Sequence, residues 1–499
     1  MPPIHQKHFF ITAPAPKGDF PPIGKEMEER YRMTHYLRYC CAMFFALICL
    51  LLATPLSAQA QNREAYVSQS EDGTTLTFYY DALRATRTGT TWGIEETKKE
   101  GDYTFPAWAG TSEEVNTTTT RVVFDASFRD FRPTTTAKWF HCCEALKQIE
   151  GLEYLNTSEV KDMSSMFSCC TSLTSLDLKN FNTKNVTDMG EMFWNCAALT
   201  SLDLKNFDTQ NVTNMGGMFA YCDKTSLDLK NFNTQNVTDM GGMFYDCWKL
   251  KSLDLKNFNT QNVTDMSNMF ASCLALTSVD LQHFNTQNVT NMDGMFFSCE
   301  ALTSLDLQHF NTQNVTNMES MFFYCKALTS LDLKNFNTQN VTDMSWMFFD
   351  CWTLTSLDLK NFNTQNVTNM SLMFTGCSAL TSLDLKNFDT QYVTDMRGMF
   401  SGCAALTTIY CNTTWWCPES ENMFADCTKL KGAVAYDKNK VDAEMANPET
   451  GYFTAQPTMV ERNRRSAAHL PAASKRVRGA RKHLPDGVQA VNGKKTVKQ

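Results

Sequence analysis

Residues 328–351 read LTSLDLKNFNTQNVTDMSWMFFDC, and near-verbatim copies of this string fill the middle of the chain. The first leucine of the SLDL element falls at residues 176, 202, 227, 253, 305, 331, 357 and 383, and a valine stands there at 279. The copies are 26 residues apart, except for one step of 25 residues. A fixed period of this length is the sequence signature of an architecture built from stacked repeats.

Each copy begins with alternating apolar and polar residues. Leu331 and Leu333 are two residues apart, so both point to one face of a short strand. Asp332 and Lys334 then point to the opposite face. This alternation predicts one short strand per repeat, with its leucines in a shared core.

The second half of each copy has a different spacing. Val341, Met344, Met347 and Phe348 follow one another at helical spacing, which predicts a turn of 3₁₀ or α helix facing the same core. A unit this small cannot bury its apolar face alone, so neighbouring units must stack. We therefore predict an α/β repeat solenoid with one short parallel strand per turn, short helical or irregular returns, and a cap at each end.

The unit resembles the repeat of the BspA-like leucine-rich repeat surface proteins, which carries the same LxxLDLxxFxTxxVTDMxxMFxxC pattern. The resemblance covers residues 136–430, and residues 71–81 and 451–454 resemble the usual flanks of that family. It implies a leucine-rich-repeat-like solenoid exposed at a cell surface. It also implies attachment to protein ligands such as host extracellular matrix proteins, host cells or the surface proteins of other bacteria.

The repeats and the composition divide the chain into five regions. Residues 1–60 are an N-terminal extension with a signal peptide, and residues 61–135 are an N-terminal cap region with strands, or alternatively a separate ligand-binding domain. Residues 136–430 hold an array of about twelve repeats. Residues 431–455 form a C-terminal cap, and residues 456–499 form a basic tail.

An export signal is predicted near the N-terminus. Residues 42–53 read AMFFALICLLLA, an apolar run shorter than the ~20 residues that span a bilayer. Arginines precede this run, and a small-x-small site ends at Ala60. This order predicts a secretory signal peptide that is cleaved between Ala60 and Gln61. An uncleaved membrane anchor is the alternative. The mature chain is then expected to be exported, with no transmembrane segment.

The tail differs in charge from the rest of the chain. Residues 456–499 contain 11 Lys/Arg against 2 acidic residues, while the whole chain has a net charge of −8. Residues 483–498 resemble the end of a Gram-negative type IX sorting signal, although Gln489 stands where an aromatic residue is usual. The resemblance implies the outer surface of a Gram-negative bacterium. A decayed signal and a basic tail that clings to acidic surfaces stay open as alternatives.

Aspartate and lysine columns form the candidate ligand-binding face. The strand alternation places the Asp and the Lys of SLDLK on the same outer face, turn after turn. The interpretations are a ligand-binding strip, a solvated face that keeps the array soluble, and a calcium ladder. The predicted site residues are Asp203, Lys205, Asp228, Lys230, Asp254, Lys256, Asp332, Lys334, Asp358 and Lys360.

The cysteines form a further column. Ten of them share one repeat position, three residues before a core leucine, where a small buried thiol packs well. Identical rotamers would hold neighbouring sulfurs parallel, which favours free thiols over bonds between turns. Cys411 and Cys417 depart from the pattern and are the candidates for a disulfide.

Catalysis, cofactors and nucleic acid find no support in the sequence. It has no nucleophile elbow, P-loop or HExxH motif, and only 8 histidines. The acidic balance of the chain before the tail would repel phosphates. We therefore predict no enzyme, no cofactor, no metal site and no nucleic acid partner.

The expected function is protein–protein interaction or adhesion through a multivalent repeated face. The alternative is a structural or antigenic surface coat without a dedicated ligand. A carbohydrate-binding module is a third class, which would need a row of exposed aromatics. The position after Met-Phe, from Trp194 to Thr375, is only partly aromatic.

Overall fold

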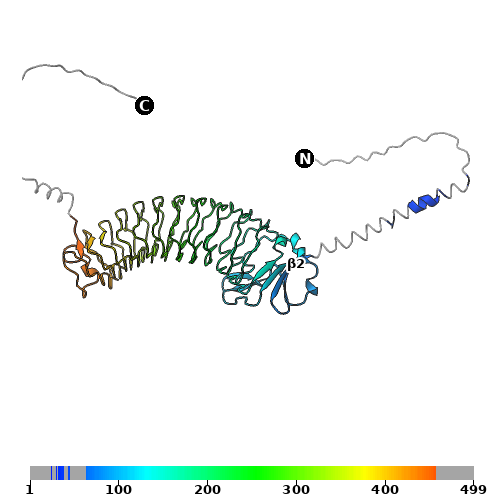
Figure 1. Cartoon of the computed structure of the whole chain (residues 1–499), viewed down its shortest axis with the longest axis horizontal. Coiled ribbons are helices and arrows are strands. Elements are labelled where there is room, and N and C mark those ends of the chain that lie inside the picture. The colour runs from blue at the N-terminus through cyan, green and yellow to red at the C-terminus, as the bar shows by residue number, and fades with distance from the viewer. Residues whose placement is uncertain (1–23, 25–29, 31, 39–42, 45–62, 457–499) are drawn as a thin grey trace, which may run out of the picture.

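The structure, a computed structural model, describes residues 24, 30, 32–38, 43–44 and 63–456. The predicted cleavage between Ala60 and Gln61 and the predicted sorting signal lie outside the described residues. Residues 63–456 form a stack of turns that bends as a gentle arc, with a group of strands at its N-terminal end and a small cap at the other (Figure 1).

The N-terminal strands continue into the array. They are β1 (Glu64–Gln69), β2 (Thr75–Asp81), β3 (Thr91–Gly93), β4 (Thr97–Glu100), β5 (Tyr103–Pro106) and β6 (Arg121–Phe124), with the 3₁₀ turns η1 (Arg84–Thr86) and η2 (Ala126–Asp130). One sheet has the order β3-β1-β2-β6-β7, and β4 pairs with β5 in a separate hairpin. The last strand of the five-stranded sheet, β7 (Gln148–Glu150), belongs to the first turn of the array and runs parallel to β6. The sheet and the array therefore share one edge.

Aromatic side chains fill the core of this N-terminal part. Phe78 stacks on Phe124 at 4.6 Å and on Trp139 at 5.3 Å between ring centroids. Trp139 lies in the first turn of the array, and all three side chains are buried. The N-terminal part thus covers the apolar end of the stack, as a cap must.

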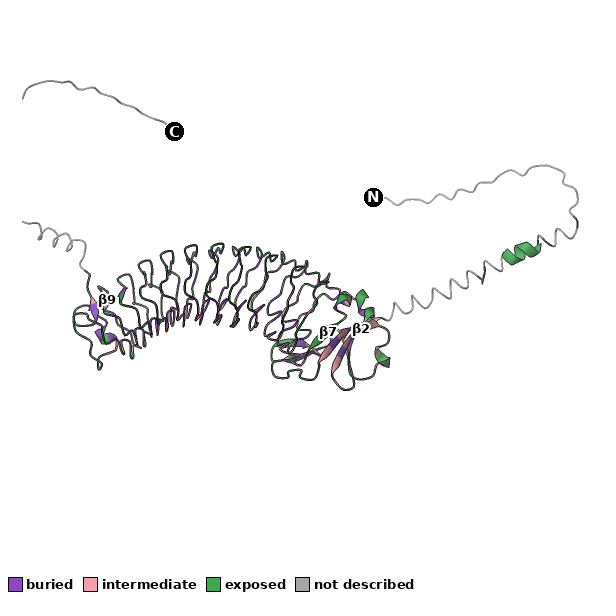
Figure 2. Ribbon diagram, in the orientation of Figure 1, coloured by how far each residue is buried: buried purple, intermediate pink, exposed green. Residues whose placement is uncertain are grey.

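Successive turns stay in register along the array. Isolated parallel bridges join one position of each turn to its copy in the next turn; this position is the Asp or Asn of the Thr-[Asp/Asn]-Met element in most turns. Among the described residues the bridges run through Thr135, Asp162, Asp188, Asn214, Asp239, Asp265, Asn291, Asn317, Asp343, Asn369, Asp395 and Glu419. Figure 2 shows the same alternation of buried and exposed residues repeating from turn to turn.

From the residue after each bridge to the residue before the column cysteine, the hydrogen bonds between turns point the same way. Met163 N donates to Asp188 O at 2.9 Å, and Phe167 N donates to Met192 O at 3.0 Å, one turn later. The same bonds recur from turn to turn. Along this segment each turn offers N–H groups toward its C-terminal neighbour and carbonyls toward its N-terminal neighbour, whereas the preceding threonine donates the other way, as Thr187 N does to Lys161 O at 2.8 Å. The two ends of the array need opposite partners.

The N-terminal cap supplies donors to the first turn. Trp108 Nε1 donates to Trp139 O at 2.9 Å, and Gly110 N donates to His141 O at 2.8 Å. No preceding turn donates hydrogen bonds to these carbonyls. The cap therefore supplies donors for groups that would otherwise be buried unpaired.

The C-terminal cap supplies acceptors to the last turn. Asn422 N donates to Asp442 Oδ1, and Phe424 N donates to Val441 O, both at 2.8 Å. Asp426 N donates to a tyrosine hydroxyl of the same cap at 3.0 Å. The caps therefore match the polarity of the ladder at each end.

The predicted strand in every turn is largely absent. The last copies of SLDL form β8 (Ser382–Asp384) and β9 (Thr408–Tyr410), which pair in parallel with each other and with β10 (Phe453–Thr454). Earlier copies approach more loosely, with bonds such as Thr355 N to Thr329 O at 3.3 Å. The leucines are nevertheless buried, because Leu331 is 6% and Leu333 0% exposed.

The predicted helical turn is also replaced by another conformation. Met347 N bonds to Met344 O and Cys351 N to Phe348 O, as in reverse turns. Trp346 has φ +61° and Asp350 has φ +53°, in the left-handed region that interrupts a helix. Among the described residues of the array, the one helical segment is the 3₁₀ turn η3 (Leu152–Tyr154); η4 (Ala443–Met445) lies in the C-terminal cap.

The core of the array consists of columns of identical residues. Val341, Met344, Met347 and Phe348 are each 0% exposed. The phenylalanines of the Phe348 column stack nearly face to face from Phe140 to Phe424, with ring centroids 5.4 to 6.0 Å apart. Helical spacing in the sequence therefore predicted burial correctly, although the backbone is not helical.

Candidate functional site

The Asp–Lys strip, made of the ten site residues predicted from the sequence, is exposed in every turn where it was predicted. Ion pairs join Asp203 to Lys205 (3.8 Å), Asp332 to Lys334 (2.9 Å) and Asp358 to Lys360 (2.7 Å), and Asp228, Lys230, Asp254 and Lys256 are exposed side chains. The structure therefore pairs the acid with the base in three of the five predicted Asp–Lys pairs.

The strip neutralises much of its own charge. The hydrogen bonds from Lys334 hold the pKa of Asp332 below its usual range, and those from Lys360 do the same for Asp358. Exposed pairs of this kind are worth ~0–1 kcal/mol, so the strip contributes little to stability. Its side chains remain available for contacts with a partner.

Each repeat also carries a ladder of amides. Asn340 Nδ2 donates to Gln313 O of the preceding turn at 2.7 Å, and Thr342 Oγ1 donates to Thr316 O at 3.2 Å. Equivalent bonds recur in the other Asn-Val-Thr copies. These side chains hold neighbouring turns together.

The cysteine column is buried and unbridged. Cys299 Sγ donates to Phe270 O at 3.1 Å, and Cys325 Sγ donates to Phe296 O at 3.2 Å. Burial raises the pKa of Cys325 to about 12 and the pKa of Cys299 well above its usual value. All sixteen cysteines within the described residues are free thiols. The column therefore packs and donates hydrogen bonds, and carries no nucleophile.

The sulfurs of the two cysteines that depart from the column contact different residues. Cys411 Sγ contacts Thr413, and Cys417 Sγ donates to Glu419 O at 3.2 Å. Both are free in the structure, so a bond between them stays a prediction.

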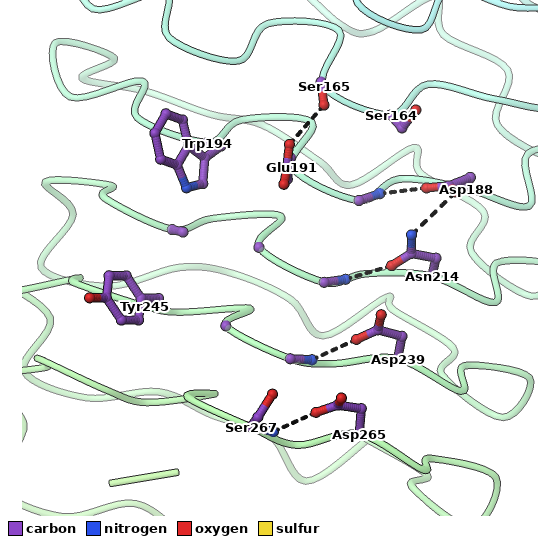
Figure 3. Close-up of a pocket in the computed structure, with 16 residues that line it drawn as sticks. Ser164, Ser165, Asp188, Glu191, Trp194, Asn214, Asp239, Tyr245, Asp265 and Ser267 are labelled. Atoms are coloured by element: carbon purple, nitrogen blue, oxygen red, sulfur yellow. Dashed lines mark hydrogen bonds between the residues drawn. The ribbon is translucent and has the colours of Figure 1, made fainter. Parts of the chain in front are cut away.

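An acidic groove lies on a different segment of the repeat, which the sequence analysis did not single out. It crosses turns near the N-terminal end of the array and has a volume of about 550 Å³ (Figure 3). Its lining residues are Ser164, Ser165, Asp188, Gly190, Glu191, Trp194, Asn214, Gly216, Gly217, Ala220, Asp239, Gly241, Gly242, Tyr245, Asp265 and Ser267.

Glycines make the floor of the acidic groove. A Cβ on Gly216 would come 3.1 Å from Asp239 Oδ1, and a Cβ on Gly217 would come 3.1 Å from Glu191 Cγ. Gly217 has φ +61°, a conformation that suits glycine. Because two consecutive turns have glycine at both positions between the methionines, the backbone is uncovered there.

Carboxylates and one amide make the first wall. Asp188 Oδ1 accepts a hydrogen bond from Gly190 N, and Asp239 Oδ1 accepts one from Gly241 N, both at 2.8 Å. These bonds fix the side chains along the groove. Burial, together with the nearby charges of Asp265 and Asp188, raises the pKa of Asp239 above its ordinary value. This wall is therefore short of positive charge.

Aromatic rings make the opposite wall. Trp194 contacts Tyr221 edge to face at 5.1 Å, and Tyr221 contacts Tyr245 at 5.3 Å between ring centroids. Figure 3 shows Trp194 and Tyr245 on one side and the carboxylates of Asp188, Asp239 and Asp265 on the other. A cation in the groove would thus meet carboxylates and aromatic rings together.

A signal for this groove is present in the sequence. The two residues between the methionines differ from turn to turn, although most of the repeat is near-verbatim. From Ser164 to Gly398 they read Ser-Ser, Gly-Glu, Gly-Gly, Gly-Gly, Ser-Asn, Asp-Gly, Glu-Ser, Ser-Trp, Ser-Leu and Arg-Gly. Variation between copies therefore marks the surface that distinguishes one turn from another.

Neither a metal site nor a membrane helix is found within the described residues. No group of three or more His, Cys, Asp or Glu side chains is placed to hold a metal ion there. No helix in that part of the chain has the length and apolar character needed to cross a membrane.

These observations define a repeat protein of stacked 26-residue turns. A family model described as "Mycoplasma protein of unknown function, DUF285" matches residues 134–252, 238–353 and 323–437, which together span more than half of the chain. The chain belongs to this family. A comparison with curated proteins finds no significant match.

Solved structures give weaker similarities. A leucine-rich repeat protein from Bacteroides ovatus is 15% identical, with 79% of this chain and 98% of that chain covered and a TM-score of 0.29. A leucine rich cell surface protein from Faecalibacterium prausnitzii is 17% identical, with 70% and 93% covered and a TM-score of 0.26.

Proposed function

We propose that this protein is an exported or surface-bound repeat protein that binds protein ligands through the Asp–Lys strip. The observation that carries the proposal is the exposure of the same acid–base pair at the same place in consecutive turns. Such a surface offers a partner many weak, equivalent contacts, which add up through effective concentration. The resemblance of the repeat to BspA-like surface proteins supports host matrix or bacterial surface proteins as ligands.

Binding to immobilised matrix and serum proteins tests this proposal. We would use the chain from Gln61 and vary the salt concentration, because exposed charge contacts are screened by salt. Replacing Asp332 and Asp358 with lysine should weaken binding only in part, since other turns remain. Complete loss of binding would indicate a compact site in place of a multivalent strip.

A structural or antigenic coat is the second candidate. It is favoured by the ion pairs within the strip, such as Asp358 with Lys360, because paired charges leave little net attraction for a ligand. If the folded array binds none of the matrix and serum proteins at low or high salt, the role of a surface coat is favoured over that of a ligand-binding protein.

The proposed location at the outer surface of a Gram-negative bacterium needs its own test. Cell fractionation and N-terminal sequencing of the exported chain should find a terminus at Gln61. A chain that retains residues 42–53 would support a membrane anchor instead.

A further inference from the structure

Three surfaces outside the core are large enough to meet a ligand: the Asp–Lys strip, a row of stacked rings and the acidic groove. The Asp–Lys strip belongs to the proposed function. The second surface is a row of rings, in which Phe323 stacks on Phe297 at 4.4 Å and on Phe349 at 4.8 Å, nearly parallel. These ring faces cover one another, so they offer no open face to a sugar. The third surface is the acidic groove, which has walls and a floor.

The dimensions of the acidic groove suit a short length of extended polypeptide. It runs from the turn of Ser164 to the turn of Ser267, four steps along the stack. At ~4.8 Å per step this is ~19 Å, a length that an extended chain covers in about six residues. Its volume of about 550 Å³ lies within the usual range of binding sites.

The charge of the groove calls for a cationic ligand. Its lining includes the carboxylates of Asp188, Glu191, Asp239 and Asp265 and contains no basic residue. Asn214 separates the charges of Asp188 and Asp239 and donates a hydrogen bond to Asp188 Oδ2. Asp239 and Asp265, by contrast, occupy adjacent turns with no amide between them. Cations that fit between them would gain charge-assisted hydrogen bonds.

The aromatic wall narrows the choice of cation. Trp194 and Tyr245 face the carboxylates across the glycine floor (Figure 3). Lysine and arginine side chains gain from rings and carboxylates at once, through cation–π contact and ion pairing. The carboxylates are spread over successive turns, and no three His, Cys, Asp or Glu side chains in the part of the chain that the structure describes converge on one point. A chain of spaced cations therefore fits the groove better than a single metal ion does.

We propose that the acidic groove binds an extended segment of a partner protein that carries lysine or arginine side chains, with its cations between the carboxylates of Asp188, Asp239 and Asp265 and the rings of Trp194 and Tyr245. This inference rests on the proposed protein-binding function and adds a specific site to it. The strip then gives many weak contacts, and the groove selects for a basic segment.

Fluorescence anisotropy with an alternating Arg-Ser peptide of about ten residues tests this site, using the chain from Gln61. The triple variant Asp188→Asn, Asp239→Asn and Asp265→Asn should bind at least about tenfold more weakly, since it loses three charge-assisted contacts. Asn occupies the same column at Asn214 and Asn291, so the fold accepts these changes. Melting curves would verify this.

A matched control removes the same charge from exposed acids elsewhere. Glu71→Gln, Glu95→Gln and Asp102→Asn lie in the N-terminal part and should change peptide affinity less than about twofold. If this control weakens binding as much as the groove variant, the attraction is diffuse and the inference is wrong.

A second variant fills the groove without changing its charge. Gly241→Ser with Gly242→Asn copies the pair Ser267–Asn268 of the following turn, where Asn268 has φ +54°. This variant should also lose peptide binding, because its side chains cover the floor. Retained affinity would exclude the groove as the binding site.

Two competitors distinguish the partner segment from other cations. Free spermidine should compete weakly; competition equal to that of the peptide would identify a small polycation as the ligand. Removal of residues 457–499 should leave peptide affinity unchanged, and a large gain would show that the tail of this chain occupies the groove. Binding to matrix proteins is measured in parallel with the same variants. Failure of the peptide to bind the groove would contradict this inference alone, because the proposed function is tested by the matrix-binding assay.

Discussion

Asn214 Nδ2 donates a hydrogen bond to Asp188 Oδ2 across 3.2 Å, and this bond places an amide between the charges of neighbouring turns. Two steps further along the same column this arrangement is lacking, because Asp239 is followed directly by Asp265. Burial and the charges of Asp265 and Asp188 raise the pKa of Asp239. The charges of these two acids thus add to the effect of burial in disfavouring the ionised form of Asp239.

Asp239→Asn should therefore raise the stability of the array at neutral pH. The amide keeps the acceptor for Gly241 N and removes one of two like charges, a change worth a few tenths to about 1 kcal/mol. The pKa of Asp239 is raised in the folded chain, so its protonated carboxyl favours folding. This contribution to stability is complete below the pKa of the unfolded chain and is lost as pH rises through the pKa of the folded chain. The gain should then shrink as pH falls toward 4, which melting curves at several pH values would measure.

Asp395→Asn is the matched control in the same column. Burial alone would raise the pKa of Asp395, but the hydrogen bonds and charge of Arg397 lower it. Arg397 Nη2 lies 2.6 Å from Asp395 Oδ2. This variant should lower the melting temperature, and a gain equal to that of Asp239→Asn would contradict the argument from like charges.

The sequence predicted the buried columns and the stacking, but not the backbone that makes them. Spacings of three and four residues correctly placed Met344, Met347 and Phe348 in the core. They did not reveal that Trp346 is left-handed, because residues with side chains occupy this conformation in many turns. Hydrogen bonds between turns stabilise it, and these depend on the neighbouring copy.

The Asp–Lys strip and the acidic groove show the same limit. Alternation placed the strip on the surface, since it depends on the local chain alone. The acidic groove depends on what consecutive turns lack, namely side chains at Gly216, Gly217, Gly241 and Gly242. Missing side chains in adjacent turns form a groove only if those positions lie side by side in space. This becomes clear when the copies are aligned and the aligned positions are placed in the structure.

Thiol titration should find almost no reactive cysteine in the folded chain from Gln61 and sixteen after unfolding. Burial keeps the column thiols protonated, as the pKa of about 12 for Cys273 and Cys325 indicates. A count of fourteen would fit one disulfide, and peptide mapping would show whether it joins Cys411 to Cys417. A count well below fourteen would contradict the free-thiol column.

Thr338→Val should destabilise the array despite its equal size. Thr338 is 0% exposed, and its Oγ1 both donates to Asn363 O and accepts from Asn363 N at 2.8 Å. Valine leaves both backbone groups unpaired, at a cost of about 1–3 kcal/mol. Urea unfolding would measure this cost. Thr338→Ser should lose much less, and Thr329→Val, on the exposed side, should be nearly neutral; equal effects at both sites would refute the role of the hydroxyl.

Acid should weaken the junction between the N-terminal cap and the array through His141. Its ring packs against Phe105 at 5.1 Å between centroids, and its Nδ1 is buried without a hydrogen-bond partner. Burial, with a smaller effect of the Lys138 charge, lowers the pKa of His141 to about 4.

The direction of the pH effect follows from this lowered pKa. The unfolded chain takes up the proton near the ordinary value of 6.5, well before the folded chain does. The stabilising contribution of neutral His141 is therefore complete above that value and is lost as pH falls toward 4. Because the ring is partly exposed, solvent screening limits the expected loss to about 1–2 kcal/mol.

Urea unfolding followed by tryptophan fluorescence would measure this loss, since Trp108 and Trp139 lie at the same junction. Between neutral pH and pH ~5, the chain should lose more stability than its His141→Gln variant, which has no group to titrate there. His283→Gln, at an exposed histidine, should behave like the unchanged chain. If all three proteins lose the same stability over this range, protonation of His141 does not control the junction, and the acid sensitivity arises from the carboxylates of the array.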